Sequence, residues 1–432
     1  MSEFLYLGID IGTSGVRAAV IDGSGAPIAG GRASLSREPS PFTDDPRGVD
    51  AGSWWRAAEA ALDAALANLE RSERSRADLR ALAVDGTSGS VVLVDGAMRP
   101  VTAGLLYDAK GFDREGAAID AVAPERSVAR GGGSALARLL HLQALAPDAA
   151  HLCHQADFLV ARLRGRAGLS DESNALKTGY DPIARRWPDW VIEAGARRDL
   201  LPEVRPVGAP LGTVGPDAVR RFGLSPETVV VAGASDGTAG FLAAGGVEPG
   251  TAVTTLGTTL TLKVLSDRPV EDAARGVYSH RVGDMWLPGG ASNTGGGALL
   301  QHFTLERMAE LSERIDPDWE PAFAAYPLPK AGERFPLNDP TLEPVEGPRP
   351  DDDARFLHAL LHGIARIERD GYRTLADLGA PYPTRVLTTG GGARNVAWTA
   401  MRERLLGVPV GVTEADPALG MARLAMRAVR ER

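Results

Sequence analysis

The sequence has 432 residues, which exceeds the size at which a single hydrophobic core normally stops growing and predicts two domains of roughly 200 residues each. With 44% hydrophobic and 24% charged residues, the composition is that of an ordinary soluble globular protein. The net charge of -9 argues against nucleic acid as a partner, because that function needs a basic surface.

The compartment is predicted from cysteine usage and hydrophobicity. Cys153 is the single cysteine, so no intrachain disulfide framework exists and a reducing compartment is compatible. The start MSEFLYLGID lacks the charged segment and the long apolar segment of a signal peptide. No apolar stretch approaches the roughly 18 residues of a membrane span. We therefore expect a cytoplasmic protein that has no membrane partner.

The first elements in chain order are a hairpin and a helix. The runs FLYLGID and AAVID flank a Gly-Thr-Ser turn and read as two strands. A helix is predicted from Ser53, a candidate N-cap. Its apolar positions follow steps of three and four residues and are Trp55, Ala58, Leu62, Ala65 and Leu69.

The middle of the chain combines strands, turns and helices. ALAVDGTSGSVVLVD at 81 to 95 reads as strand, turn and strand, and 134 to 164 shows short helical patterns. VVVAGASDGTAGFLAAGG at 229 to 246 reads as a buried strand, a turn and a helix of small residues that begins near Asp236. The turn GVEPGT follows, and we place the domain boundary there, giving domains 1–245 and 246–432.

The second half contains two glycine-rich turns. WLPGGASNTGGGALL is a strand followed by a loop too rich in glycine to be packing alone, and 335 to 353 reads as an exposed loop. A helical face follows and consists of Leu357, Leu360, Leu361, Ile364 and Ile367. RVLTTGGGARNVAW then gives strand, turn and helix. Strands and helices mix throughout, so the predicted class is α/β.

The turn after the first strand is a candidate phosphate site. Gly12, Thr13 and Ser14 expose successive backbone N–H groups and hydroxyls, which phosphate oxygens need, and glycine permits close approach. Asp10, just before the turn, can hold Mg²⁺ directly or through water. One such turn by itself is more often an ordinary β-turn.

The same pattern, a Gly-Thr-Ser/Thr turn between two strand-like runs, occurs a second time in TTLGTTLTLKVLSD at 254 to 267. Gly257, Thr258 and Thr259 form its turn. Two matching hairpins in two half-chains suggest duplicated domains that bind one polyphosphate from both sides. No GxxxxGK[ST] motif occurs, and we find no GxGxxG after a strand. The sequence therefore lacks the main motif of a P-loop nucleotide site and that of a dinucleotide-binding fold.

The triple glycine at 390 to 392 lies where a strand ends and a helix begins, the usual nucleotide position in an open α/β sheet. A turn that starts a helix and binds no ligand is an equally good reading of it. Asn395 and Trp398 follow on the first turns of the helix, where an amide and an indole can meet an adenine edge or face. Trp398 also fits a core position.

Asp236 in GASDGTAG is the candidate acid/base group. It follows a buried strand and opens a helix, so we expect its carboxylate at the floor of a cleft, fixed by packing. An N-cap role also suits this position and is compatible with the first. The histidine pairs, His151 with His154 and His358 with His362, lack the companions of a metal motif and are assigned no metal.

These motifs give the chain a resemblance. Four motifs follow one another along the chain: GIDIGTSGVRAAVID, GASDGTAG, TTLGTTLTLKV and TTGGGARNVAW. In that order they resemble the first phosphate hairpin, the catalytic-aspartate segment, the second phosphate hairpin and the adenosine loop of the FGGY carbohydrate kinases. That family belongs to the actin-like ATPases. The resemblance covers essentially the full length and implies two duplicated ribonuclease H-like domains with a cleft between them.

The resemblance also implies roles for individual residues. Asp236 is expected to accept the proton of the attacking hydroxyl, Asp10 to organise Mg²⁺, and Thr13 to contact the γ-phosphoryl group. Gly257 and Thr258 are expected to hold the inner phosphates of ATP. The adenosine is expected at Gly391, Gly392 and Asn395. The implied cofactors are ATP and Mg²⁺, the partner is a small sugar, and the protein is expected to be a monomer or homodimer.

Within the family, DGTSG at 85 to 89 and ALKTGYDP at 175 to 182 look like the short-chain sugar kinases of plants and cyanobacteria that act on D-ribulose. The stretch DGTSG supplies the short polar side chains of Asp85, Thr87 and Ser88 close together at the end of a strand, where they can read sugar hydroxyls; capping of the turn is the alternative role of Ser88. Sugar contacts are then expected from Asp10, Ser88 and Asp236. Bacterial xylulokinases carry Gln-Met-His where this chain has DGTSG. D-Xylulose or another ketopentose or polyol remains the alternative substrate, and an actin-like nucleotide switch or filament protein is the alternative from another class.

Overall fold

The computed structural model describes residues 4–246, 248–413 and 416–430. The chain divides into two compact units. The first unit comprises Met1–Gly245, His280–Gly283 and Ala415–Arg432, and the second unit comprises Gly246–Ser279 and Asp284–Glu414.

The chain first passes between the units at Gly245 and Gly246, where the turn GVEPGT predicts the boundary; residue 247 of that turn lies outside the described residues. The C-terminal segment differs from the prediction of a second domain running to 432. Its helix α13 (Pro417–Arg430) belongs to the first unit, because its apolar residues, including Met421 and Ala422, are buried against the first sheet. The functions predicted for the two domains remain predictions.

A six-stranded sheet forms the centre of the first unit, in the order β11-β12-β5-β1-β2-β3. Strands β1, β2 and β3 are antiparallel neighbours, whereas β1, β5 and β12 run parallel. The strands are β1 (Leu5–Ile11), β2 (Gly15–Ile21), β3 (Pro27–Ser34), β5 (Leu79–Gly86), β11 (Pro210–Thr213) and β12 (Val229–Ser235). The predicted first hairpin is therefore confirmed.

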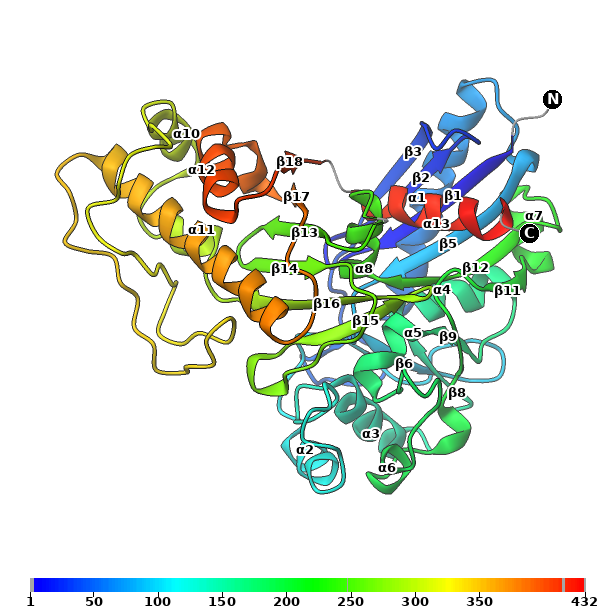
Figure 1. Ribbon diagram of the computed structural model, residues 1–432. Helices are drawn as coiled ribbons and strands as arrows, with labels where there is room; N and C mark the ends of the chain where they lie inside the picture. Colours follow the sequence, from blue (N-terminus) through cyan, green and yellow to red (C-terminus); the bar gives the residue numbers. More distant parts are fainter. Residues whose placement is uncertain (1–3, 247, 414–415, 431–432) are drawn as a thin grey trace. The chain divides into compact units, whose positions relative to one another are not determined.

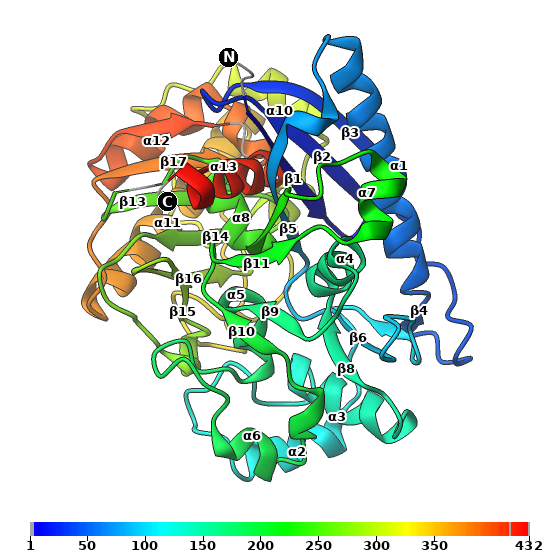
Figure 2. The same cartoon turned by 90° about the vertical axis from the view of Figure 1, so that its right-hand side faces the viewer.

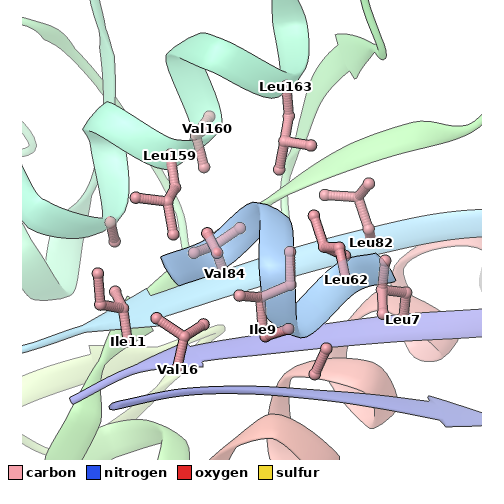
Figure 3. Close-up of a cluster of buried hydrophobic side chains, with 14 of the residues drawn as sticks. Leu7, Ile9, Ile11, Val16, Leu62, Leu82, Val84, Leu159, Val160 and Leu163 are labelled. Carbon is pink, nitrogen blue, oxygen red and sulfur yellow. The ribbon is translucent and has the colours of Figure 1, made fainter. Parts of the chain in front are cut away.

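Helices cover both faces of this sheet. Figure 2 shows α1 (Gly52–Arg71) and α13 on opposite sides of β1, β2 and β3. Alternate residues of β1 explain this arrangement, since Leu7 and Ile9 face α1 and α4 (Gln155–Arg164) while Tyr6 faces α13. Figure 3 shows Leu159 and Leu163 of α4 in the cluster of buried side chains above the strands.

The helix predicted from Ser53 forms, but its N-cap is Ala51 and makes no side-chain cap bond. The Ser53 hydroxyl instead donates to the carbonyl of Asp50 at 2.6 Å. Four of the five predicted apolar positions are buried, and Trp55 is partly buried while its neighbour Trp54 is buried fully. The spacing of the apolar residues identified the buried face of α1 correctly, although the predicted N-cap, Ser53, was wrong.

The rest of the first unit includes a small sheet in the order β4-β7-β6-β8 and a parallel pair of β9 and β10. Its remaining elements are β4 (Gly48–Val49), η1 (Arg76–Asp78), β6 (Val91–Val94), β7 (Gly104–Leu105), α2 (Asp113–Asp120), α3 (Ala135–Leu145), β8 (His151–His154), β9 (Leu169–Asp171), α5 (Glu172–Ala175), η2 (Leu176–Thr178), α6 (Asp189–Glu193), η3 (Arg198–Leu200), β10 (Glu203–Arg205), α7 (Pro216–Phe222) and α8 (Asp236–Ala243).

The second unit contains a six-stranded sheet in the order β15-β16-β14-β13-β17-β18, and Figure 1 shows α11 and α12 beside it. Its elements are β13 (Thr251–Leu256), β14 (Leu260–Val264), η4 (Ala273–Arg275), β15 (Tyr278–Val282), β16 (Met285–Ser292), α9 (Gly296–Leu299), α10 (Leu305–Ser312), α11 (Asp353–Asp377), β17 (Arg385–Thr389), η5 (Gly391–Arg394), α12 (Val396–Leu406) and β18 (Val410–Val412).

The two sheets share one strand pattern. In the second unit, β13 pairs antiparallel with β14 and parallel with β17, as β1 pairs with β2 and β5 in the first. The order β16-β14-β13-β17-β18 therefore repeats β3-β2-β1-β5-β12. This repeat supports the duplicated domains that the two hairpin motifs predict. No helix among the described residues is both long and apolar enough to span a membrane.

A buried ion pair joins the central strands and helices of the second unit. The guanidinium of Arg402 on α12 donates to both carboxylate oxygens of Glu368 on α11, at 2.6 and 2.7 Å, and both side chains are fully buried. Thr254 on β13 donates to Glu368 at 2.5 Å, and Arg402 donates to Thr388 on β17 at 2.8 Å. The network ties the two strands to the two helices.

Breaking this pair should destabilise the protein strongly. We expect Glu368→Gln to lower the free energy of unfolding by about 3–5 kcal/mol, because the buried guanidinium loses its counter-charge. Urea denaturation measures the change. Glu403→Gln, an exposed change on α12, the helix of Arg402, is the control and should stay within about 0.5 kcal/mol of the parent; equal effects of the two substitutions would contradict the assignment.

Candidate functional site

A pocket of about 740 Å³ in the first unit collects the predicted residues of the N-terminal half. We call it the first pocket. It is lined by the strand ends and turns that the motifs mark: Asp10, Gly12, Thr13, Ser14, Gly15, Val16, Arg17, Arg32, Ala33, Ser34, Thr87, Ser88, Tyr107, Lys177 and Asp236. The parallel strands β1, β5 and β12 bring Asp10, Ser88 and Asp236 together because their carboxyl ends meet at one edge of the sheet.

The first hairpin turn has the form that its motif predicts. Gly12 N–H donates to the carbonyl of Gly15 at 2.9 Å and closes the turn between β1 and β2. Thr13 and Ser14 at the tip are exposed. Their hydroxyls and backbone thus face the first pocket, where an anion can be bound by N–H and O–H donors.

Asp10 forms a pair with a second carboxyl group. The parallel register of β1 and β5 sets Asp10 beside Asp85, whose two carboxyl oxygens are buried and have no hydrogen-bond partner among the described residues. Burial raises the pKa of Asp10 to about 6, while the neighbouring Asp85 carboxyl and the charge of Arg17 act in the opposite direction. Burial also raises the pKa of Asp85 well above its ordinary value, and the charge of Asp10 adds to this.

Asp85 therefore has a different place from the one its motif suggests. The sequence predicts that Asp85, Thr87 and Ser88 of DGTSG face the ligand together. Asp85 is instead completely buried and does not line the first pocket. Its position in the strand, with its side chain toward Asp10, is decided by the β1–β5 register, which the sequence does not reveal.

The two hydroxyls of the DGTSG turn also differ. Thr87 Oγ1 donates to Gln155 Oε1 at 2.5 Å and lies 2.7 Å from the Ser90 hydroxyl. Ser88 Oγ is buried and has no hydrogen-bond partner among the described residues. A buried hydroxyl without a partner is costly unless a ligand supplies one. Ser88 thus does not cap its turn, and its hydroxyl is left for a bound molecule.

Asp236 is the first residue of α8, and Ser235 holds the N-cap position without a side-chain cap bond. The predicted N-cap role is therefore wrong by one residue. The carboxylate is exposed rather than at a packed floor, and Gly237 N–H donates to its Oδ1 at 2.7 Å. Its backbone, not its side chain, is fixed by packing.

A cluster of buried hydroxyls explains why that backbone is fixed. Ser173 Oγ lies 2.8 Å from Ser235 Oγ and 3.2 Å from Thr238 Oγ1, and it accepts from Ser235 N–H at 3.1 Å. His280 Nδ1 is 3.1 Å from the same hydroxyl. The start of α8 is therefore held from beneath, which leaves the Asp236 carboxylate directed into the first pocket.

The second unit contains a pocket of about 570 Å³, the second pocket, which collects the predicted residues of the C-terminal half. Gly257 and Thr258 come from the turn between β13 and β14, and Gly391 and Gly392 from η5. The remaining lining is mainly apolar: Leu256, Gly296, Leu299, Leu300, Leu305, Met308, Ala309, Ser312, Glu313, Leu357, Leu361, Arg394, Asn395, Val396, Ala397 and Trp398. Such a lining suits a flat, partly apolar group such as a nucleobase.

The glycine-rich loop SNTGGG supports the second hairpin. Gly296 N–H donates to the carbonyl of Gly257 at 2.8 Å, and Gly297 N–H donates to that of Thr258 at 3.0 Å. A Cβ atom at Gly295, whose φ is +136°, would lie 2.8 Å from the Thr258 carbonyl oxygen. Glycine is required there because backbone approaches backbone, which explains why the loop is so rich in glycine.

Asn395 and Trp398 line the second pocket, but their polar atoms already have partners. Asn395 is the N-cap of α12: its Oδ1 accepts from Trp398 N–H at 3.0 Å and its Nδ2 donates to Ser312 at 2.8 Å. The Trp398 indole N–H donates to the Leu361 carbonyl at 3.0 Å, and the ring is buried. The structure favours the core reading of Trp398. Both residues shape the pocket wall.

Some pocket residues were missed in the sequence. Arg17 and Arg32 pair in register on β2 and β3, and Arg17 Nη1 lies 3.8 Å from Asp10; the sheet register that brings them to the pocket leaves no local signal in the sequence. Tyr107 comes from a loop without a recognisable pattern, and Lys177 from η2, within the ALKTGYDP stretch. Among the described residues, no three His, Cys, Asp or Glu side chains are grouped to hold a metal ion.

Comparisons with known proteins agree with this geometry. Residues 252–429 match the model of the C-terminal domain of the FGGY family of carbohydrate kinases. The xylulose kinase of Escherichia coli is 27% identical over 98% of this chain and 89% of that protein. The autoinducer-2 kinase of Yersinia enterocolitica is 28% identical over 96% of this chain and 84% of that protein.

The chain is therefore similar to the FGGY family of carbohydrate kinases over residues 252–429, and to kinases of two bacteria over nearly its full length. The fold of this kinase also matches that of a xyloylose kinase from Brucella ovis, with a TM-score of 0.88, 24% identity and coverage of 99% of this chain and 91% of the other. Its architecture is thus the two-domain α/β fold of that structure.

The Asp10–Asp85 pair predicts how the stability of the kinase depends on pH. A carboxyl group whose pKa is raised by folding binds more protons in the folded state, so stability falls as pH rises above about 4. We expect Asp85→Asn, which retains a donor toward Asp10, to raise the melting temperature at pH 8 but hardly at pH 4. Each pKa unit corresponds to about 1.4 kcal/mol.

Thermal melts of parent and variant, without nucleotide or Mg²⁺, measure this difference at both pH values. A similar difference between the two proteins at pH 4 and pH 8 would show that Asp85 does not carry the buried charge.

Proposed function

We propose that this kinase phosphorylates a ketopentose, D-ribulose in the first instance, at its 5-hydroxyl with ATP as the donor. The observation that carries the proposal is Ser88: its hydroxyl is buried, has no partner among the described residues, and lines the same pocket as Asp10 and Asp236. A sugar hydroxyl supplies the missing hydrogen bond. An epimer that cannot supply it leaves a buried polar atom unpaired, which discriminates strongly.

Asp236 is the proposed general base. Its carboxylate is exposed to the first pocket, while the hydroxyl cluster beneath α8 holds its backbone. A base needs this combination of free access and fixed position, so that the carboxylate accepts the proton of the sugar hydroxyl as the hydroxyl attacks phosphorus. The Gly237 N–H bond to Oδ1 leaves Oδ2 for that proton.

The phosphates and the adenosine are assigned to the two hairpins and the second pocket. Gly12, Thr13 and Ser14 are proposed to contact the γ-phosphoryl group, and Gly257 and Thr258 the inner phosphates. Backbone N–H groups are suited to this because phosphoryl transfer needs mainly alignment and charge neutralisation. The apolar lining of the second pocket, with Gly391 and Gly392 at its edge, is proposed to hold the adenosine.

Mg²⁺ fits the first pocket. Proteins bind this ion through one or two carboxylates together with phosphate oxygens and water, and Asp10 and Asp236 supply carboxylates beside the first hairpin. Asp10 is the proposed ligand, directly or through water. When bound, the ion would neutralise charge on the phosphates.

D-Xylulose and other ketopentoses or polyols are the alternative substrates. The xylulose kinase and autoinducer-2 kinase relatives favour such an alternative, whereas DGTSG and ALKTGYDP in this chain resemble the D-ribulose kinases and lack the Gln-Met-His of xylulokinases. A coupled ADP-release assay over ketopentoses, polyols and aldoses decides between them. ATP consumption that no sugar stimulates would instead favour the actin-like switch or filament protein.

The first test concerns the base. We expect Asp236→Asn to lower kcat by at least about 100-fold while ATP still binds, because the change removes the base and keeps the shape. Asp217→Asn, an exposed aspartate in the first turn of α7, is the matched control and should leave kcat unchanged. A smaller loss for Asp236→Asn would contradict the general-base role.

The second test concerns the sugar. Ser88→Ala should raise the KM for D-ribulose by roughly 10-fold, the value of one buried hydrogen bond, and leave the KM for ATP unchanged. If wild-type enzyme turns over D-xylulose or glycerol with a clearly higher kcat/KM than D-ribulose, the substrate assignment is wrong and the family assignment stands.

A further inference from the structure

Lys177 lines the first pocket beside the residues proposed to bind the sugar. It lies in the 3₁₀ helix η2, whereas Arg17 and Arg32, the other cationic side chains of the pocket, come from β2 and β3 next to the phosphate hairpin. Lys177 therefore belongs to the wall formed by loops, together with Thr87, Ser88 and Tyr107.

A buried polar network holds η2 in place. Thr178 Oγ1, next to Lys177, lies 2.8 Å from Nε2 of His154, and Nδ1 of the same ring lies 2.6 Å from Asp157 Oδ2. His154 is completely buried. Gly179 closes the helix with φ +102°, where a Cβ atom would lie 2.8 Å from the Trp190 ring. Lys177 thus extends from a backbone that is fixed on both sides.

The DGTSG turn is anchored against the same place. A Cβ atom at Gly89 would lie 3.9 Å from Cδ of Lys177 and 3.6 Å from Nη1 of Arg138. The buried Arg138 donates to the carbonyls of Gly89, Tyr107 and Ala109 at 3.1, 2.5 and 3.0 Å. The turn with Ser88, the loop with Tyr107 and the stem of Lys177 therefore form one preorganised wall.

The chemistry of this wall favours a sugar with a carbonyl group. A keto oxygen only accepts hydrogen bonds, and an ammonium only donates them. Asp10 and Asp236 accept when ionised, so they recognise hydroxyls and not a carbonyl. Lys177 is the only side chain on the loop wall of the first pocket that donates without accepting. Loss of a hydrogen bond to a charged group lowers affinity by roughly 10- to 100-fold.

We propose that Lys177 is a specificity-determining residue whose ammonium donates a hydrogen bond to the carbonyl oxygen of the ketopentose. The inference rests on the proposed function and adds the group that distinguishes a ketose from the corresponding pentitol, which has a hydroxyl in place of the carbonyl. It also gives the buried His154–Asp157 pair a role, since that pair positions Lys177 through Thr178.

The kinetic test compares Lys177→Met with Lys177→Gln, which restores a donor. Lys177→Met should raise the KM for the ketopentose roughly 10- to 100-fold, leave the KM for ATP within about twofold, and reduce the preference for ketopentose over pentitol; Lys177→Gln should recover part of that preference. Lys110→Met is the control, because Lys110 lies on the loop after Tyr107 but lines a different pocket. An unchanged preference in Lys177→Met would overturn the proposal.

A second test uses the wild-type enzyme. The chain has four lysines, Lys110, Lys177, Lys263 and Lys330, so acetylation by a lysine-specific reagent can be followed at each by mass spectrometry. Saturating ketopentose without ATP should slow the modification of Lys177 and leave the other three unchanged. If the enzyme accepts no ketopentose, the proposed function fails, and protection is measured with its best substrate. Modification of Lys177 at the same rate with and without that substrate would overturn the inference.

Discussion

The parallel pairing of β1, β5 and β12 is the constraint on which the first unit depends. Parallel strands end at the same edge of a sheet, so the residues at those ends meet there: Asp10 near the end of β1, Ser88 in the turn after β5, and Asp236 directly after β12. The same pairing sets Asp85 against Asp10 in the interior. One backbone arrangement thus supplies both the open pocket and the buried carboxyl group behind it.

The second unit uses the same strand order for a different task. Its hairpin and its η5 turn follow β13 and β17, which the buried Glu368–Arg402 pair holds together through Thr254 and Thr388. Its pocket is mainly apolar, whereas the first pocket contains carboxylates, hydroxyls and cations. The two sheets thus share one strand order, but their pockets have different linings. The lining of the second pocket suits a nucleobase, and that of the first pocket suits a polyhydroxylated acceptor.

The buried polar groups next to the first pocket share one property: each fixes the position of a residue that lines the pocket. The Ser173 cluster holds the start of α8 behind Asp236, the His154–Asp157 pair holds η2 behind Lys177, and Arg138 holds the two loops with Ser88 and Tyr107. Buried polar atoms are stabilising only when they are satisfied. Here the hydrogen-bond partners of the buried polar atoms come from neighbouring segments of the chain. The network that stabilises the fold therefore also orders the pocket.

The sequence by itself determined the α/β class, both hairpins, the strand before Asp236 and the buried face of α1, because these depend on residue periodicity and on turn residues a few positions apart. It also predicted that Asp10, Ser88, Gly257 and Gly391 belong to binding sites, and the structure finds each of them in the lining of a pocket. Only the tertiary structure decided that Asp85 is buried against Asp10, that α13 packs on the first sheet, and that Lys177 and Arg17 line the first pocket. Strand register and the packing of distant segments set these positions, and a single sequence carries no local signal for either.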